Sequence, residues 1–214
     1  MQKILLADRQ DITRAGMQFV CLGMNDVDTK YVEDKAELIL SLKESLEAVV
    51  VLDYTLFDFN DADELLIFNL RFPNVRWVLF SEDLTQDFVR QIVASSNQFS
   101  VVLKESPMNE IREALRYAMS GQRYICQRTA ELLLSPQASL YDDDIKLTKT
   151  ETEILKDIAL GMTTKEIADK RISSFHTVNT HRKNIFRKLG VNNVHEATKY
   201  ALRAGLVDSA EYYI

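Results

Sequence analysis

Four short apolar runs and one weaker strand-like segment, at residues 27–32, alternate with five helix-like segments over the first 120 residues, and this alternation limits the possible folds more than any other feature. The strongest run, residues 48–53, consists of Ala, Val and Leu and ends in Asp53. Uninterrupted apolar runs of this length are typical of strands that are buried on both faces of a parallel sheet. The alternation therefore predicts an α/β domain with a doubly wound, five-stranded parallel sheet.

The expected elements follow one another with short connections. We expect strands at residues 3–8, 27–32, 48–53, 75–81 and 99–103, and helices at 11–22, 34–42, 62–70, 85–94 and 107–120. A further helical pattern covers 123–134, and an acidic stretch follows it at 141–144. We therefore divide the chain into a first domain at 1–120, a helical and acidic linker at 121–146, and a second domain at 147–214.

Polar side chains stand at the ends of four expected strands: Asp8, Asp53, Ser81 and Lys104. In open α/β sheets the carboxyl ends of the strands form the edge where ligands bind. The first domain resembles the receiver domain of two-component response regulators, which has a flavodoxin-like fold. The resemblance implies that Asp53 is the phosphate-accepting aspartate. It also implies that Lys104 contacts the phosphoryl group and that Ser81 is the switch hydroxyl.

Arg9 departs from the receiver pattern, because receivers carry an acidic Mg²⁺ ligand at this position. Mg²⁺ prefers several oxygens in near-octahedral geometry, and a guanidinium removes one ligand and repels the ion. We therefore expect weak or absent Mg²⁺-dependent phosphorylation, no resident cofactor, and an Arg9 that pairs with Asp53 or Asp8. The alternative is that Arg9 points to solvent while Asp11 or a water supplies the oxygen. A sensor histidine kinase would then switch the protein conventionally through Asp53.

A helix expected from Ser174 to Gly190 organises the second domain. Its apolar residues share one stripe, and a polar, cationic row occupies another face. A short helix at 163–171 precedes it across a tight turn, which is the layout of a DNA-binding helix-turn-helix. Residues 163–203 carry nine Lys or Arg against three Asp or Glu, although the whole chain has a net charge of −6. This contrast indicates local anion binding.

The second domain resembles the LuxR-type helix-turn-helix over residues 147 to about 206. The resemblance rests on Leu147, Thr148, Glu151, Glu153, Ile154, Leu155, Ile158, Ala159, Gly161, Thr164, Lys165, Glu166, Ile167, Ala168, Thr177, Val178, His181, Asn184, Ile185, Lys188, Leu189, Gly190, Val191, Glu196 and Ala197. It implies a four-helix domain that binds double-stranded promoter DNA as a homodimer. Arg171 and Ser173 stand where the family usually has apolar residues, so we expect the turn to pack differently.

The candidate DNA contacts lie on the two helices of this motif. Amides, hydroxyls and ammonium groups read base edges, whereas cations and hydroxyls also hold phosphates. We expect base contacts from Asn179, Thr180 and Lys183, and phosphate contacts from Lys165, Thr177, Arg182 and Arg187.

Several other classes of protein are disfavoured. No apolar run approaches membrane-spanning length, and no signal-peptide pattern opens the sequence. Cys21 and Cys126 lie far apart, as is typical of reduced thiols in a cytosolic protein. An enzyme is not expected, because the sequence has no glycine-rich phosphate loop and no histidine before residue 176. We predict a cytoplasmic DNA-binding regulator of the response-regulator class with an atypical receiver. A helix-turn-helix that binds protein remains an alternative.

Overall fold

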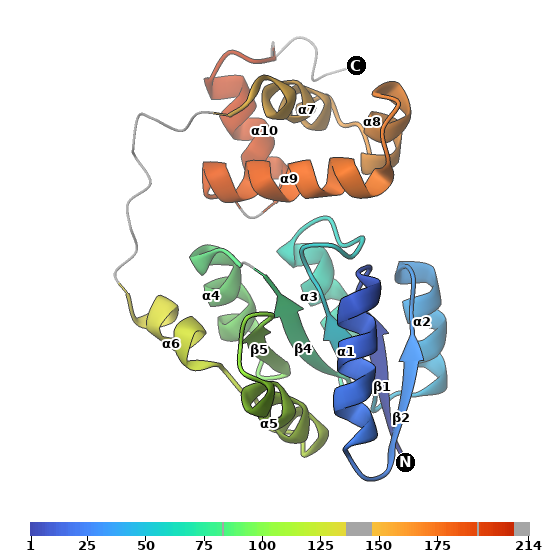
Figure 1. The fold of residues 1–214 in the computed structure, drawn as a ribbon. Coiled ribbons are helices and arrows are strands. Elements are labelled where there is room, and N and C mark those ends of the chain that lie inside the picture. The colour runs from blue at the N-terminus through green and yellow to red at the C-terminus, as the bar shows by residue number, and fades with distance from the viewer. Residues whose placement is uncertain (83, 136–146, 192, 208–214) are drawn as a thin grey trace. The chain divides into compact units, whose positions relative to one another are not determined.

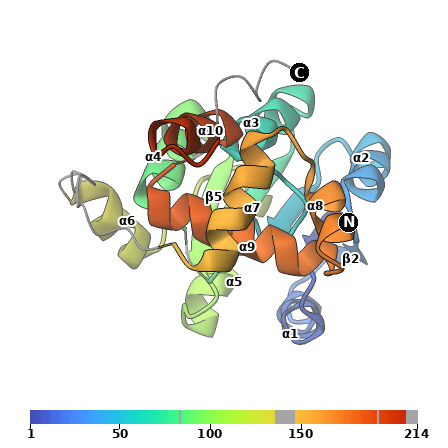
Figure 2. The same cartoon turned by 90° about the horizontal axis from the view of Figure 1, so that it is seen from above.

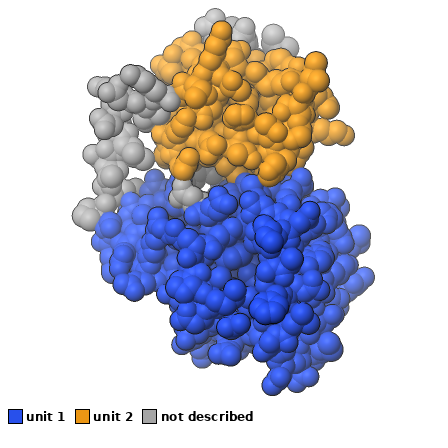
Figure 3. All heavy atoms as spheres, in the orientation of Figure 1, with its two compact units in different colours: residues 1–59, 63–136 blue, residues 60–62, 137–214 orange. Residues whose placement is uncertain are grey.

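The structure is a computed structural model that describes residues 1–82, 84–135, 147–191 and 193–207. It divides the chain into two compact units, which Figure 3 colours separately. Residues 1–59 and 63–136 form the first unit, and residues 60–62 and 137–214 form the second.

A five-stranded parallel sheet in the order β2-β1-β3-β4-β5 forms the centre of the first unit. Its strands are β1 (Gln2–Ala7), β2 (Val27–Tyr31), β3 (Val49–Leu52), β4 (Arg76–Ser81) and β5 (Phe99–Leu103). In the central strand β3, which is buried throughout, Val50 pairs with Leu5 of β1 and Trp77 of β4. This is the flavodoxin-like strand order, so the predicted doubly wound fold is confirmed.

Helices cover both faces of this sheet (Figures 1 and 2). One face carries α1 (Asp11–Leu22) and α5 (Met108–Met119), and the other carries α2 (Lys35–Glu44), α3 (Ala62–Arg71) and α4 (Gln86–Ser95). Under α1 and α5 the core includes Met17, Val20, Ile111 and Leu115. Elsewhere in the core, Phe59 packs edge-on against Phe68 and Trp77. Burial of these apolar side chains is the main favourable term in folding.

The linker helix begins later than the sequence pattern predicts. Helix α6 covers Gln127–Leu134, whereas the pattern indicated a start near residue 123. The intervening residues instead pair with the free edge of β5. The Val101 N–H donates to the Tyr124 carbonyl at 2.8 Å, and the Cys126 N–H donates to the Val101 carbonyl at 2.9 Å. The acidic stretch at 141–144 lies outside the described residues.

The second unit contains the four expected helices: α7 (Lys149–Ala159), α8 (Thr164–Lys170), α9 (Phe175–Leu189) and α10 (Val194–Arg203). Each begins at a residue whose side chain accepts a backbone N–H, namely Thr148, Thr163, Ser174 and Asn193. Such N-caps satisfy donors that the helix leaves open. Helix α9 ends at Gly190, whose φ of +63° lies in the left-handed region. No helix in the described ranges is both long and apolar enough to cross a membrane.

An ion-pair network joins α7 to the turn of the helix-turn-helix, where the family has apolar contacts. Asp157 of α7 is buried. Its Oδ2 accepts from Arg171 Nε at 2.8 Å and Nη2 at 2.6 Å, and its Oδ1 accepts from Lys170 Nζ at 2.7 Å. Hydrogen bonds between two charged groups are shorter and stronger than those between neutral groups. An ion pair therefore stabilises the turn at Arg171, where the family usually has an apolar residue.

Ile172, the next residue of this turn, has an unusual backbone conformation. Its φ is +51°, and 97% of its side chain is exposed. A β-branched residue in the left-handed region is strained, by roughly 1–3 kcal/mol, and here no side-chain burial compensates for the strain.

Replacement of Ile172 by Asn should therefore stabilise the second unit by about 1 kcal/mol, because Asn tolerates this conformation better. Urea unfolding followed by circular dichroism measures the effect. Fluorescence of Trp77, the chain's single tryptophan, reports on the first unit and serves as the internal control. An unchanged or lower midpoint for the second unit would show that the turn is not strained.

Candidate functional site: a charged crevice and a basic helix

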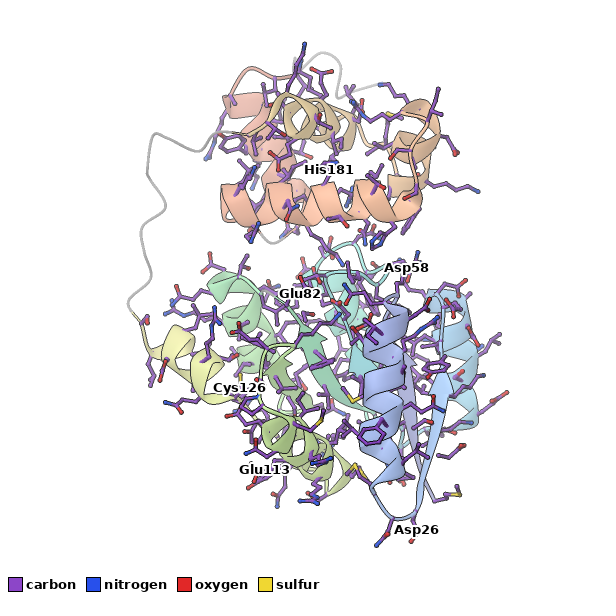
Figure 4. The ribbon with its side chains drawn as sticks, viewed as in Figure 1. Asp26, Asp58, Glu82, Glu113, Cys126 and His181 are labelled. Atoms are coloured by element: carbon purple, nitrogen blue, oxygen red, sulfur yellow. The ribbon has the colours of Figure 1, made fainter. Side chains whose placement is uncertain are left out.

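Four polar side chains meet at the carboxyl ends of the strands in the first unit. Asp8 follows β1, Asp53 follows β3, Ser81 ends β4 and Lys104 follows β5. Asp8, Asp53 and Ser81 are buried, and Lys104 is half-buried. Asp58, from the loop after β3, lies at this same end of the unit, far from Asp26 at the other end (Figure 4).

The ammonium group of Lys104 holds the crevice together. Its Nζ lies 2.5 Å from Asp53 Oδ2 and 2.8 Å from Asp8 Oδ2, and it donates to Gln10 Oε1 at 2.7 Å. Lys104 thereby links the loops after β1 and β3 to the loop after β5.

The remaining oxygens of the two aspartates are occupied by nearby residues. Asp53 Oδ1 accepts from the backbone N–H of Thr55 at 2.8 Å and from its hydroxyl at 2.6 Å. Asp8 Oδ1 accepts from the backbone N–H of Gln10 at 2.7 Å. The sequence interpretation missed both Thr55 and Gln10. Their spacing of two residues after an aspartate is the signal that could have revealed them, since it suits a local turn.

Burial and charge shift the protonation of this cluster. Burial raises the pKa of Asp8, although the hydrogen bond from Lys104 opposes the shift. Burial alone would lower the pKa of Lys104, but the charge and hydrogen bond of Asp53 outweigh it and raise that pKa. Lys104 is therefore a permanent cation at neutral pH.

Arg9 is half-buried, and its Nε is shielded from solvent. Its positive charge acts on Asp58, where it lowers a pKa that burial raises overall. The described ion pairs of Asp8 and Asp53 go to Lys104, so the pairing of Arg9 with either aspartate stays a prediction. Asp11, the alternative oxygen donor, has a side chain that is 93% exposed and pairs with Arg14 at 2.9 Å.

The donor set of this crevice does not fit a Mg²⁺ ion. Over the described ranges, no three acidic, histidine or cysteine side chains are grouped so that they could hold a metal. Arg9 brings a positive charge to the loop after β1, while Lys104 engages an oxygen of both Asp8 and Asp53. A hard divalent cation such as Mg²⁺ would need the same carboxylate oxygens as ligands.

Ser81 differs from its neighbours in the crevice. Its hydroxyl is buried and makes no hydrogen bond to the described part of the protein. The backbone carbonyl of Ser81 accepts from the Lys104 N–H at 3.1 Å, which fixes the position of the residue. An unsatisfied buried hydroxyl is uncommon and calls for a reason.

In the second unit, α9 is oriented by its apolar face. Val178, Ile185 and Leu189 lie in the core, as the stripe predicts. Near the end of the helix, Lys188 Nζ donates to Glu151 Oε2 of α7 at 2.6 Å. Burial opposes the ionisation of Glu151, but the hydrogen bonds from Lys188 and Thr148 outweigh it and lower its pKa. The ion pair and the core together hold α9 against α7.

The predicted DNA contacts take different positions around α8 and α9. Lys165, Thr177 and Arg187 are exposed, Thr180 and Lys183 are half-buried, and Asn179 and Arg182 are buried. The Thr180 hydroxyl donates to the His176 carbonyl at 3.0 Å. The guanidinium of Arg182 lies 5.6 Å from the ring centre of Phe186, on the next turn of the helix. Their roles toward DNA stay predictions.

Replacement of Lys104 by Met should destabilise the first unit by about 3–5 kcal/mol, because two buried carboxylates then face each other without a cation. Urea unfolding followed by Trp77 fluorescence measures the loss. Addition of Asp53→Asn removes one of the two charges and should recover part of the stability. A Lys104→Met protein that unfolds at the wild-type urea concentration would show that the carboxylates do not depend on this lysine.

Comparisons with known proteins agree with both units. Residues 146–201 match the family "Bacterial regulatory proteins, luxR family". The transcriptional regulatory protein LiaR of Bacillus subtilis (strain 168) is 28% identical over 214 residues, which cover 97% of this chain and all of LiaR.

Two solved structures share the fold of the chain. RcsB of Salmonella enterica serovar Typhimurium bound to promoter P1flhDC has a TM-score of 0.56 at 21% identity and covers 93% of this chain and 97% of its own. The structure of two RcsB dimers bound to two parallel DNAs has a TM-score of 0.54 at 23% identity, with coverage of 97% and 99%. The chain thus joins a flavodoxin-like domain to a helix-turn-helix region that matches the luxR family of bacterial regulatory proteins.

Proposed function

We propose that this protein is a transcription regulator that binds promoter DNA in the cytoplasm as a homodimer and reads the major groove with α9. The observation that carries the proposal is the luxR-family match over residues 146–201, joined to a helix-turn-helix whose second helix is fixed by its core face and by the Glu151–Lys188 pair. RcsB, which shares the fold, is described as dimers on DNA. This supports the same assembly here.

Charge supports DNA as the partner. The helix-turn-helix region is cationic within an acidic chain. A cationic module on an acidic protein attracts polyanions locally, and phosphate contacts give DNA binding most of its affinity. We infer that the exposed Lys165, Thr177 and Arg187 hold phosphates and that Thr180 and Lys183 contact base edges. Arg182, assigned to a phosphate, and Asn179, assigned to a base edge, are buried and would have to become accessible before they could contact DNA.

Two substitutions on α9 distinguish the two roles. Lys183→Ala should cost about 1–3 kcal/mol of discrimination between a duplex selected from a random pool and an unrelated duplex. Arg187→Ala should weaken binding to both duplexes alike. It should also reduce by about one the slope of the logarithm of the binding constant against the logarithm of the salt concentration. Fluorescence anisotropy over a range of salt concentrations measures both effects.

Lys199→Ala on α10 is the matched control, since it removes the same charge from an exposed position of the same unit. Wild-type discrimination by Lys183→Ala would refute the assignment of the reading face. Salt-independent binding of the wild type would favour a protein partner instead.

We also propose that Mg²⁺-dependent phosphorylation of Asp53 is weak or absent. Lys104 already pairs with both Asp8 and Asp53, and Arg9 adds a second positive charge to the crevice. A divalent cation would have to displace Lys104 from at least one carboxylate while Arg9 repels it. Abundance, assembly or another ligand would then control the protein.

One observation favours the conventional alternative, in which a sensor kinase phosphorylates Asp53. The buried hydroxyl of Ser81 has no hydrogen-bond partner in the described protein, so it is available to a phosphoryl oxygen. Lys104 also lies close enough to Asp53 to accompany the charge of a phosphoryl group.

Intact mass after incubation with a small-molecule phosphodonor and Mg²⁺ distinguishes a receiver that is not phosphorylated from one that is phosphorylated at Asp53. We expect no adduct on the wild type, and an adduct on Arg9→Asp, which restores an acidic ligand. Asp53→Asn placed in the Arg9→Asp protein is the control that identifies the modified residue. A Mg²⁺-dependent adduct on the wild type that Asp53→Asn abolishes would establish the conventional switch.

A further inference from the structure

A buried carboxylate of α7 faces the turn that connects the two helices of the helix-turn-helix. Asp157 is only 3% exposed. Its Oδ2 accepts hydrogen bonds from both Nε and Nη2 of Arg171, and its Oδ1 accepts one from Lys170 Nζ. A buried carboxylate is costly unless it is paired and hydrogen-bonded. Loss of this contact should therefore have a larger effect than loss of an ion pair on the surface.

The segment that joins α8 to α9 has little other hold on the core. None of residues 169–177, all of which the structure describes, is buried. The buried side chains on either side of this segment are Ala168 and Val178. Ile172, near the centre of the segment, is exposed. Fully buried apolar side chains therefore do not fix the segment, and the hydrogen bonds to Asp157 tie it to α7.

The backbone carries the position of Arg171 to the start of α9. The Ser173 N–H donates to the Ala168 carbonyl at 3.0 Å, which closes the turn against the end of α8. Ser174 then caps α9, because its hydroxyl accepts the Thr177 N–H at 3.0 Å. Two residues separate Arg171 from this cap. A displacement of Arg171 therefore displaces the first turn of α9.

Reading of bases requires finer placement of α9 than attraction to phosphates does. The proposed base contacts, Thr180 and Lys183, lie in the turns that follow the cap. Hydrogen bonds to base edges form only at donor–acceptor distances of about 2.7–3.2 Å. The attraction of a cation to a phosphate extends over a Debye length of about 8 Å at physiological salt. A displaced α9 therefore loses discrimination between sequences before it loses its affinity for DNA in general.

Asp157 also neutralises cations beside the DNA-reading helix. Side chains of Lys170 and Arg171 are 53% and 24% exposed, and both pair with this one carboxylate. Phosphate contacts carry no sequence information, and they add affinity for every duplex. Loss of the Asp157 charge would leave both cations available to phosphates. Binding to unrelated DNA should then become stronger and more dependent on salt.

We propose that Asp157 is a positioning residue for DNA recognition, which acts through Arg171 on the first turn of α9. It raises discrimination in two ways. It holds the reading helix in place, and it keeps Lys170 and Arg171 from adding affinity that is independent of sequence. The proposal rests on the proposed function and adds to it a residue that does not itself touch DNA.

Asp157→Asn tests the proposal, because it keeps the shape of the side chain and removes the charge. Fluorescence anisotropy with the selected and the unrelated duplex, over a range of salt concentrations, measures both affinities. The ratio of the two affinities should fall about tenfold, which corresponds to one good base contact. Binding to the unrelated duplex should become tighter, and its salt dependence should steepen by about one phosphate contact. A role confined to stability would not tighten that binding.

Glu153→Gln is the matched control for the change in charge. It removes one negative charge from the same helix, where Glu153 pairs with Lys156 of α7 itself at 3.1 Å. The ratio of the two affinities should stay at the wild-type value. A Glu153→Gln protein that discriminates as poorly as Asp157→Asn would overturn the proposal.

Arg171→Leu and Lys170→Met identify the residue that transmits the effect. Each removes one cation from the same carboxylate. Arg171→Leu should lower the ratio of affinities about tenfold, because the turn loses its contact with α7. Lys170→Met should keep the ratio within about twofold, because the lost pair is half-exposed and Arg171 still donates twice to Asp157. Equal losses would overturn a route through Arg171.

Asp157→Leu combined with Arg171→Leu separates the contact from its charge. Replacement of both members of a buried ion pair by apolar residues is often neutral or stabilising. The double variant should therefore recover most of the discrimination that Arg171→Leu loses. A double variant that discriminates no better than Arg171→Leu would overturn the positioning role.

Failure of this proposal differs from failure of the proposed function. A wild type that discriminates between the duplexes, together with an Asp157→Asn protein that discriminates equally well, overturns the role of Asp157 alone. A wild type that binds neither duplex overturns the DNA-binding function and the role of Asp157 with it.

Discussion

The contact of Lys104 with Asp8 and Asp53 is the interaction on which the first unit depends most. Two carboxylates at the carboxyl edge of the sheet are buried, and each would be costly there without a cation. The ammonium group contacts both carboxylates, although its single charge balances only one of them, and it also binds Gln10, so it joins three strand ends that are distant in sequence. Any cation that enters the crevice must therefore compete with this lysine for the two carboxylates.

The sequence alone allowed the fold to be predicted, because its signals are local and repeated. Four of the five strands had an apolar run at their centre, and each helix of the second unit had a capping residue such as Thr148 or Thr163. The buried stripe on α9 followed from the spacing of Val178, Ile185 and Leu189. The start of α6 was wrong because pairing of residues 124–126 with β5 is a tertiary effect, which a helical periodicity cannot reveal.

The candidate site was only partly predictable. Strand ends brought Asp8, Asp53, Ser81 and Lys104 to one edge, but the hydrogen bonds of Gln10 and Thr55 depend on side-chain geometry. The same holds for Arg171, which stands where the family usually has an apolar residue and pairs with the buried Asp157. A substitution that replaces an apolar contact with an ion pair preserves the fold. The sequence therefore reveals the unusual residue but not the residue that pairs with it.

The pairing of residues 124–126 with β5 has a consequence for the behaviour of the protein at high concentration. An open sheet has two edge strands, and an unprotected edge is a template for aggregation. Here the chain's own backbone covers part of the β5 edge. The other edge, β2, carries Asp28 and Lys30 within a strand of only five residues, and inserted charges disfavour addition of a further strand. The sheet is thus protected from fibril-like growth by a different device on each side.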